Sequence, residues 1–231
     1  MRELTAALAD VYFLRDQPEA LRAEIAKLAA CRKYPRGNIL FHHGDPGSML
    51  YIVIDGQVKV SVISEDGREV VVALMRPSGV CGLISALDGG ANVGTAMTVS
   101  ECYLAAIPAD RFLGWLRGHP ALHESLLLGM AQMIRAAYEK VGEQALLPVK
   151  KRLLFTLVDI ARREGQTSGS DIVFIRPTHQ ELADRIGTTR VVVCRALKEL
   201  LEEEGIIHAT GGRTLRVRLT AVQEATPYSV T

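Results

Sequence analysis

The residues with the clearest capacity for chemistry lie in one stretch, "THQELADRIGTTRVVVCRALKELLEEEGII", which covers residues 178–207. Thr178 with Glu181 three residues later has the spacing of a capping box, in which side chain and backbone satisfy each other at the start of a helix. Gly187 can end that helix in the left-handed conformation, and Thr189 can cap the next one. Two helices joined by so short a turn predict a helix-turn-helix.

The second of these helices has an inner and an outer face when its residues are placed about 100° apart. The outer face presents Thr188, Val191 and Arg195, and Arg190 flanks the first turn. Arginine pairs bidentately with guanine, and a valine methyl group can contact the methyl group of thymine. We therefore expect this helix to read DNA bases, although a solvated face on a helix pair that merely packs has the same pattern. The residues expected to pack on the first helix are Val193, Ala196, Leu197 and Leu200.

The segment that follows, "GIIHATGGRTLRVRL", has the pattern of a β-hairpin. Leu215, Val217 and Leu219 alternate with arginines, the period of a half-buried strand, and a Thr-Gly-Gly-Arg turn precedes them. Arg213 stands at the end of that turn. We expect this wing to lie over phosphates, which position a protein on DNA without specifying sequence.

A long helix is expected before this module, because the residues between Pro120 and Pro148 have apolar side chains at helical spacing. Their apolar stripe is too wide for a lone surface helix, so we expect it to cover its own domain and also a second copy of itself. The alternative is a helix buried within one chain. Residues 4–30 also have helical spacing, interrupted near Pro18.

Between these helical regions the sequence has the texture of short strands. Val58, Val60 and Val62 alternate with polar residues, and Asp-Gly pairs at 55–56 and 66–67 separate such runs. Asp-Gly between alternating runs is a strong hairpin signal, and many short strands with regular turns predict a sandwich or barrel. The resulting domains are a β-barrel over 1–119, a long helix and hinge over 120–147, and a DNA-binding domain over 148–231.

Composition places the chain among ordinary globular proteins, with 48% hydrophobic and 23% charged residues and a net charge of +1. Residues 148–231 carry 13 Lys and Arg against 10 Asp and Glu, a basic excess too small to identify a nucleic-acid binder by itself. No apolar run is long enough to cross a membrane. The four cysteines contain no C-x-x-C pair, so we expect a cytoplasmic protein with reduced thiols.

The order barrel, long helix, helix-turn-helix and wing resembles the cyclic-AMP receptor/FNR (CRP/FNR) family of bacterial transcription regulators. The motifs that carry the resemblance are "FHHGDPGSMLYIVIDGQVKV", "YEKVG" and "THQELADRIGTTR". The resemblance implies an α+β fold with a cyclic-nucleotide-binding-like β jelly-roll barrel, a long dimerisation helix and a winged helix-turn-helix. It implies a homodimer on a pseudo-palindromic operator in double-stranded DNA, no catalytic activity, and contact with RNA polymerase if the protein is an activator. The residues expected to contact DNA are Thr178, Thr188, Thr189, Arg190, Val191, Arg195 and Arg213.

The chain departs from the cyclic-AMP-binding members in the segment that binds the nucleotide. Those members have Gly-Glu-Leu followed by an Arg-Ser pair, whereas here Leu83 follows Gly82 and Thr95 lies in the Arg-Ser region. A Thr-Ser pair of the long helix is replaced by residues 137–138, Ala and Tyr. Burying a phosphate without a cation is prohibitive, so cyclic AMP is not expected to bind and the effector is unknown. Any effector pocket would involve Gly82, Leu83, Ile84, Thr95 and Tyr138.

Two alternatives remain. In a haem- or redox-sensing member, Cys81 could ligate iron and oxidation of Cys194 could hinder DNA binding, but for both residues a small buried thiol is the expectation. A cupin-like metal enzyme with a winged-helix appendage would need three or four convergent His or Glu ligands. His42 and His43 are adjacent, so on a strand they point to opposite faces, and no metal site or catalytic residue is expected.

Overall fold

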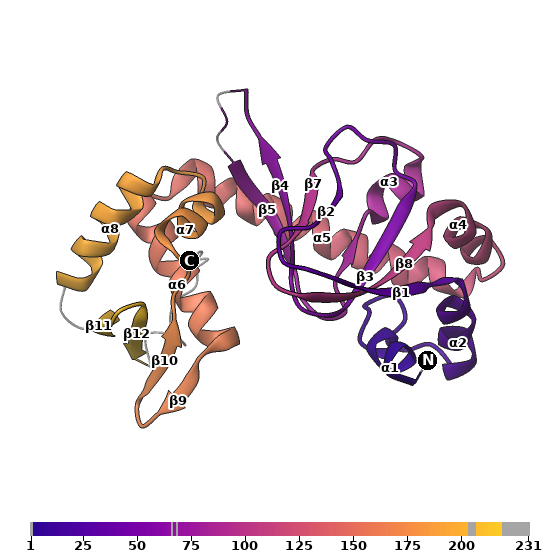
Figure 1. Ribbon diagram of the computed structural model, residues 1–231, viewed down its shortest axis with the longest axis horizontal. Coiled ribbons are helices and arrows are strands. Elements are labelled where there is room, and N and C mark those ends of the chain that lie inside the picture. The colour runs from indigo at the N-terminus through magenta and orange to yellow at the C-terminus, as the bar shows by residue number, and fades with distance from the viewer. Residues whose placement is uncertain (1, 66, 68, 203–206, 219–231) are drawn as a thin grey trace. The chain divides into compact units, whose positions relative to one another are not determined.

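The computed structural model describes most of the chain (Figure 1); the residues outside the description are 1, 66, 68, 203–206 and 219–231. Three residues of the predicted hairpins, Asp66, Ile206 and Leu219, therefore lie outside the described residues. The chain divides into two compact units, residues 1–67 with 71–136 and residues 68–70 with 137–231. Both units contain helices and antiparallel strands, which is the predicted α+β class.

The β-structure of the first unit consists of two antiparallel sheets with strand orders β1-β8-β3-β6 and β2-β7-β4-β5. This order is that of a jelly roll, in which two sheets enclose a core. The strands are β1 (Ala30–Tyr34), β2 (Ile39–Phe41), β3 (Met49–Asp55), β4 (Val58–Ile63), β5 (Glu69–Met75), β6 (Val80–Cys81), β7 (Thr95–Thr98) and β8 (Cys102–Pro108). The Asp-Gly pair at 55–56 connects β3 to β4, with Gly56 at φ +87°. The hairpin predicted there is wrong, because β3 and β4 belong to different sheets and each pairs with other strands.

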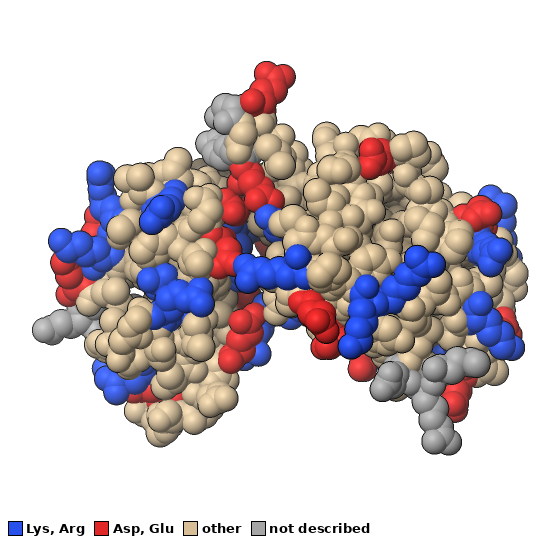
Figure 2. Space-filling model, viewed as in Figure 1, with Lys and Arg blue, Asp and Glu red and all other residues tan. Residues whose placement is uncertain are grey.

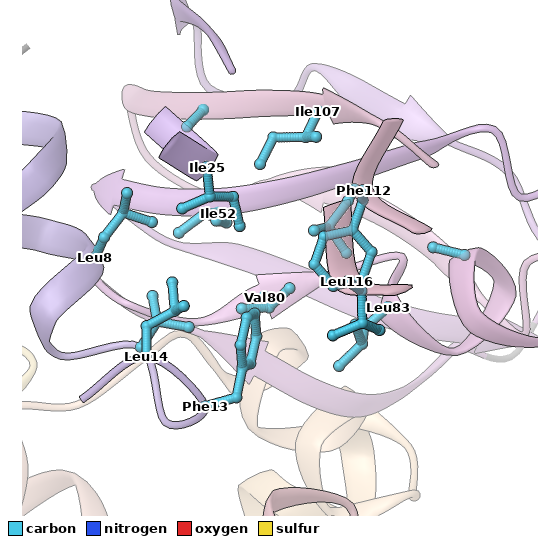
Figure 3. Close-up of a cluster of buried hydrophobic side chains, with 14 of the residues drawn as sticks. Leu8, Phe13, Leu14, Ile25, Ile52, Val80, Leu83, Ile107, Phe112 and Leu116 are labelled. Atoms are coloured by element: carbon cyan, nitrogen blue, oxygen red, sulfur yellow. The ribbon is translucent and has the colours of Figure 1, made fainter. Parts of the chain in front are cut away.

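Strand β3 is buried on both faces and so separates two hydrophobic clusters. Tyr51 and Val53 point into the space between the sheets, whereas Leu50 and Ile52 point to the opposite face. That opposite face is covered by helices, and Figure 3 shows the cluster beneath them. The helices of this unit are α1 (Arg2–Ala9), α2 (Glu19–Leu28), α3 (Leu83–Asp88), α4 (Ala109–Arg117) and the start of α5 (Ala121–Leu146).

The long helix α5 matches the predicted span and changes its environment along its length. Its first turns are buried at Leu122 and Leu126, and Gly129 is packed so closely that an added Cβ would lie 1.8 Å from Cε2 of Tyr12. All of residues 131–139 are exposed. Among the described residues, no helix is long and apolar enough to span a membrane.

The second unit is built around the helix-turn-helix and a small sheet. Its helices after α5 are α6 (Val149–Glu164), α7 (His179–Ile186) and α8 (Arg190–Glu202). Its strands are β9 (Gln166–Ser168), β10 (Asp171–Ile175), β11 (Ile207–Gly211) and β12 (Thr214–Arg218), in the order β11-β12-β10-β9. One hydrophobic cluster joins the three helices to β10 and β12, so the helix-turn-helix and the wing share a core.

Candidate nucleic-acid interface

Local hydrogen bonds set the start and the end of α7. The backbone N–H of Glu181 donates to Oγ1 of Thr178 at 3.2 Å, and the N–H of Thr178 donates to Oε2 of Glu181 at 2.7 Å. These reciprocal bonds are the predicted capping box. Gly187 ends the helix with φ 65°, a left-handed conformation that glycine adopts without a Cβ penalty.

The faces of α8 are those that the helical spacing predicted. Val193 is fully buried in the core of the second unit, whereas Val191 is 70% exposed and Val192 37% exposed. Thr189 precedes the helix, and its Oγ1 accepts from the N–H of Val192 at 3.4 Å. The other predicted inner residues are buried as well: Ala196, Leu197 and Leu200. The three consecutive valines thus point in three directions, and only one of them faces the core.

A groove runs along the outer face of α8. Val191, Cys194, Arg195 and Lys198 line it along one side of the helix, because they are spaced three and four residues apart. Arg190 from the first turn also contributes, as does His179 of α7. Figure 2 shows several Lys and Arg side chains over the part of the second unit where α7 and α8 lie. The groove therefore combines an apolar strip with cations, a combination suited to base edges and phosphates.

Cys194 corrects an expectation from the sequence. Its thiol was expected to be buried, because cysteine is among the most frequently buried residue types. The structure places Cys194 on the surface of the groove instead. The reason is its position three residues after Val191, which puts both side chains on the same outward face of α8.

A second hollow adjoins the groove and brings together arginines from three places in the chain. Arg176 precedes α7, Arg190 opens α8, and Arg213 lies in the wing turn. The N–H of Arg176 donates to the carbonyl oxygen of Arg213 at 3.0 Å, which ties the wing to the start of the helix-turn-helix. Burial and the neighbouring Arg213 lower the pKa of Arg176.

The arginines of this hollow act on a neighbouring histidine. Burial, followed by the charges of Arg176 and Arg190, lowers the pKa of His179 below its usual value. The Nε2 atom of His179 is buried and makes no hydrogen bond with the described residues. Thr178 and Gln180 complete the lining. A phosphate placed here would relieve the repulsion among the cations and accept hydrogen bonds from them.

Of the residues expected to contact DNA, most lie on this surface. Val191 and Arg195 line the groove, and Arg190 lines both the groove and the hollow. Thr189 is exposed and Thr188 half-buried in the turn between the helices. Thr178 and Arg213 line the hollow.

Four further lining residues were not found from the sequence: Arg176, His179, Gln180 and Lys198. Helical spacing from Val191 could have identified Lys198, and the first turn of α7 could have identified His179 and Gln180. Arg176 had no local signal, since its place depends on the wing folding back onto it.

The segment that binds the nucleotide in cyclic-AMP receptors has a different character here. Leu83 is 4% exposed and belongs to the hydrophobic cluster, where Figure 3 shows it beside Phe112 and Leu116. Gly82 has φ +79°, and an added Cβ would lie 2.4 Å from the carbonyl oxygen of Met49. Ile84 is 41% exposed.

The polar groups of this segment bind one another. Oγ of Ser85 donates to Oδ1 of Asn92 at 2.8 Å, and both side chains are buried. Oγ1 of Thr95 accepts from the N–H of His43 at 3.0 Å. Tyr138, the remaining residue of the expected effector pocket, lies on α5 and is 75% exposed.

Metal ligands do not converge in the described part of the chain. His42 and His43 are both exposed, as expected of loop residues. Within the residues that the structure describes, no group of three His, Cys, Asp or Glu side chains could hold a metal ion. Cys81 is buried, and burial raises the pKa of its thiol to about 12, with a smaller contribution from Cys102.

A jelly roll, a long helix and a winged helix-turn-helix with an exposed basic groove define a DNA-binding transcription regulator. Two family models match the chain, a cyclic nucleotide-binding domain over residues 31–119 and a Crp-like helix-turn-helix domain over residues 151–223. The chain is 30% identical over 187 residues to the CRP-like cAMP-activated global transcriptional regulator of Mycobacterium tuberculosis, which covers 79% of this chain and 82% of that protein.

Two further relatives agree with this result. The cyclic AMP receptor protein of Thermus thermophilus is 30% identical over 199 residues, which is 86% of this chain and 88% of that protein. The structure of the c-di-GMP responsive global regulator CLP of Xanthomonas campestris shares the fold, with a TM-score of 0.77 and 24% identity over 87% of this chain and 99% of that one. The chain belongs to the CRP/FNR family of transcription regulators. Its relatives are regulators rather than enzymes, which favours this reading over the cupin-like metal enzyme.

Proposed function

We propose that the protein is a homodimeric, sequence-specific regulator that binds a pseudo-palindromic operator without cyclic AMP. The single observation that carries this proposal is the outer face of α8, where Val191 and Arg195 are exposed in a groove beside a hollow lined by arginines. We infer a sensor barrel over 1–119, a dimerisation helix and hinge over 120–147 and a DNA-binding domain over 148–231.

Each part of this surface has a distinct role on DNA. Arg190 and Arg195 pair with guanine in the major groove, and Val191 contacts a thymine methyl group. Thr178, Thr188, Thr189 and Arg213 bind phosphates, as helix starts and wing turns do in this class of protein. Valine accepts no hydrogen bond, so the base pair facing Val191 need not supply a cytosine amino group. We expect tolerance or a preference for thymine there.

The exposed side of α5 supports dimerisation. Its large apolar residues Leu127, Ile134, Tyr138 and Val141 are between 55% and 75% exposed. They are spaced seven, four and three residues apart and so form one stripe along the helix. A second copy of α5 would cover this stripe, and a two-fold dimer would present two α8 helices to successive major grooves.

Independence from cyclic AMP rests on the character of the barrel segment. Residues 77–110 contain neither Lys nor Arg, so this segment offers no cation for a cyclic phosphate. Leu83 stands in place of the ribose-binding Glu and is buried in the hydrophobic cluster. The residues present do not fit cyclic AMP, and an effector site around Gly82, Leu83, Ile84, Thr95 and Tyr138 stays a prediction.

No observation favours haem over an unliganded barrel. A thiolate ligand must be deprotonated, whereas burial raises the pKa of Cys81 to about 12. A regulator of bacterial genes acts in the cytoplasm, and one that activates transcription would also contact RNA polymerase.

The decisive experiment is selection of bound duplexes from a random pool at fixed salt, since phosphate contacts make affinity depend on salt. We expect a pseudo-palindrome with half-sites about 10–11 base pairs apart, recovered with and without added cyclic AMP. Recovery of duplexes with no common sequence, or only in the presence of cyclic AMP, would contradict the proposal.

Base reading by α8 predicts a contrast between two arginines. Arg195→Ala should relax the preference for one guanine by about 1–3 kcal/mol while leaving other positions unchanged. Arg213→Ala, in the wing, should weaken binding to all sequences about equally and lower the salt dependence. Fluorescence anisotropy on single-base operator variants measures both. Uniform weakening by Arg195→Ala would show that this residue does not read a base.

A further inference from the structure

The last turns of α5 contact the turn of the helix-turn-helix. Nζ of Lys140 donates to the carbonyl oxygen of Arg185 at 3.1 Å. Arg185 lies in the last turn of α7, where carbonyl groups have no partner within the helix. A cation at a helix C-terminus is also favoured by the helix dipole. Lys140 therefore caps the first helix of the DNA-binding motif from a different helix.

A second contact lies one turn further along α5. Gln144 is four residues after Lys140, so both side chains share one face of the helix. A Cβ added at Gly187 would lie 2.9 Å from Oε1 of Gln144, which places this amide against the turn between α7 and α8. Nη1 of Arg152, on α6, donates to the backbone oxygen of Gln144 at 2.9 Å and to its Oε1 at 2.8 Å. The end of α5 is thus held both by α6 and by the helix-turn-helix.

Burial distinguishes this part of α5 from the part before it. Residues 131–139 are all exposed, whereas Lys140 and Gln144 are half-buried. Burial lowers the pKa of Lys140; the carboxylates of Glu143 and Asp159 act in the opposite direction, and the charges of Arg152 and Arg185 lower it further. An ammonium group removed from water needs a partner, and the carbonyl of Arg185 supplies one.

We propose that Lys140, with Gln144, is a positioning residue that fixes the orientation of the helix-turn-helix relative to α5. The inference rests on the proposed dimer, in which α5 pairs with its copy. In such a dimer, the attachment of each DNA-binding motif to its own α5 sets the separation of the two α8 helices. Covalently, α5 and α6 are joined only through Leu147 and Pro148. So short a link limits distance but leaves the angle free, and the contacts of Lys140 and Gln144 fix that angle.

The test compares duplexes that differ in geometry rather than in sequence. Full-length protein is titrated with the selected operator, with operators whose half-site spacing is changed by one or two base pairs, and with a duplex in which one half-site is scrambled. The variants are Lys140→Met, which keeps the apolar stem, and Lys140→Arg, which keeps a charged donor. Lys27→Met, an exposed lysine on α2, is the matched control for loss of a charge.

We expect Lys140→Met to weaken binding to the correctly spaced operator about tenfold, the order expected for one hydrogen bond to a charged group. Binding to the altered spacings should change less, so the preference for the native spacing shrinks. Affinity for the duplex with one half-site should stay within about twofold of wild type, because the contacts of α8 with bases are unchanged. Lys140→Arg should restore most of the spacing preference, and Lys27→Met should behave as wild type.

Equal weakening on every duplex, or an unchanged spacing profile, would overturn the positioning role. If Lys140→Met fails to fold, Gln144→Ala provides a second variant, since it removes no charge. It should reduce the preference for the native spacing by about threefold. An unchanged spacing profile in folded Gln144→Ala would also overturn the inference. If wild-type protein bound the scrambled duplex as tightly as the full operator, the proposed dimeric function itself would fail, which is a distinguishable result.

Discussion

The two units of this protein differ in where their polar side chains lie and in what those side chains contact. In the DNA-binding unit, Arg190, Arg195 and Arg213 project from the surface around a groove and a hollow. In the barrel unit, the polar groups of the segment corresponding to the nucleotide site bind one another, as Ser85 does with Asn92. An interface for a charged polymer must leave its cations accessible, whereas polar side chains that are buried and bonded to each other are less available to a ligand. This difference supports the proposal that one unit binds DNA while the other does not bind a cyclic phosphate.

If the proposal is correct, membership of the family does not carry every binding site of the family with it. Relatives 30% identical to this chain are named for cyclic AMP, yet Leu83 is part of a core cluster with Phe112 and Leu116. Substitutions at paired buried and exposed positions test this difference between the two units.

The largest effect is expected from restoring the acidic residue in the barrel. Leu83→Glu places a carboxylate without a cation in the hydrophobic cluster, and should lower the free energy of unfolding by about 3–5 kcal/mol. The neighbouring Ile84 is 41% exposed, so Ile84→Glu should cost less than about 1 kcal/mol. Fluorescence of Trp115, the single tryptophan, which packs against the same cluster, reports the urea transition.

Neither variant should acquire saturable cyclic-AMP binding, because no cation accompanies the new carboxylate. Wild-type stability for Leu83→Glu would show that this position has access to solvent or to a partner charge. The barrel segment around Leu83 would then be more open to charged groups than the burial of Leu83 indicates.

A smaller effect is expected from the same substitution at two positions of α8. Val193→Ala removes methyl groups from a fully buried site and should lower the free energy of unfolding by about 2 kcal/mol. Val191→Ala, at a position 70% exposed, should change it by less than about 0.5 kcal/mol. Circular dichroism during urea unfolding compares the two. Equal destabilisation would mean that Val191 is covered within the folded chain.

The smallest perturbation is chemical modification of thiols. It should distinguish the exposed thiol of one unit from the buried thiol of the other without unfolding either unit. The thiolate is the reactive form, and burial raises the pKa of Cys81 to about 12, whereas Cys194 is exposed. A maleimide at pH 7.5 should modify Cys194 at least about a hundredfold faster than Cys81, which reacts only on opening of the barrel. Mass spectrometry of tryptic peptides follows both sites, and Cys194→Ser should abolish the fast reaction. Rapid modification of Cys81 in the folded protein would show that the barrel core is open.

Much of the site could be predicted because its determinants are local. The capping box joins residues three apart, Gly187 acts through its own φ angle, and the division of Val191 from Val193 follows from helical spacing. The same helical spacing could have shown that Cys194 faces outward. The residue type suggested burial instead, but Cys194 is exposed because of its position on the helix. The wing was also predictable, from alternation and a glycine turn.

The sequence by itself determined the order of barrel, long helix, helix-turn-helix and wing, and the outward face of α8, because periodicity and short-range hydrogen bonds specify these features. It did not predict the short helices α3 and α4. Only the tertiary structure decided which distant residues meet. Arg176 bonds to Arg213, 37 residues away, and Lys140 to Arg185, 45 residues away. It also decided that Leu83 points into the hydrophobic cluster. Such contacts depend on how elements pack, and no pattern within a helix or a strand encodes the side chain that will cap its end from another helix.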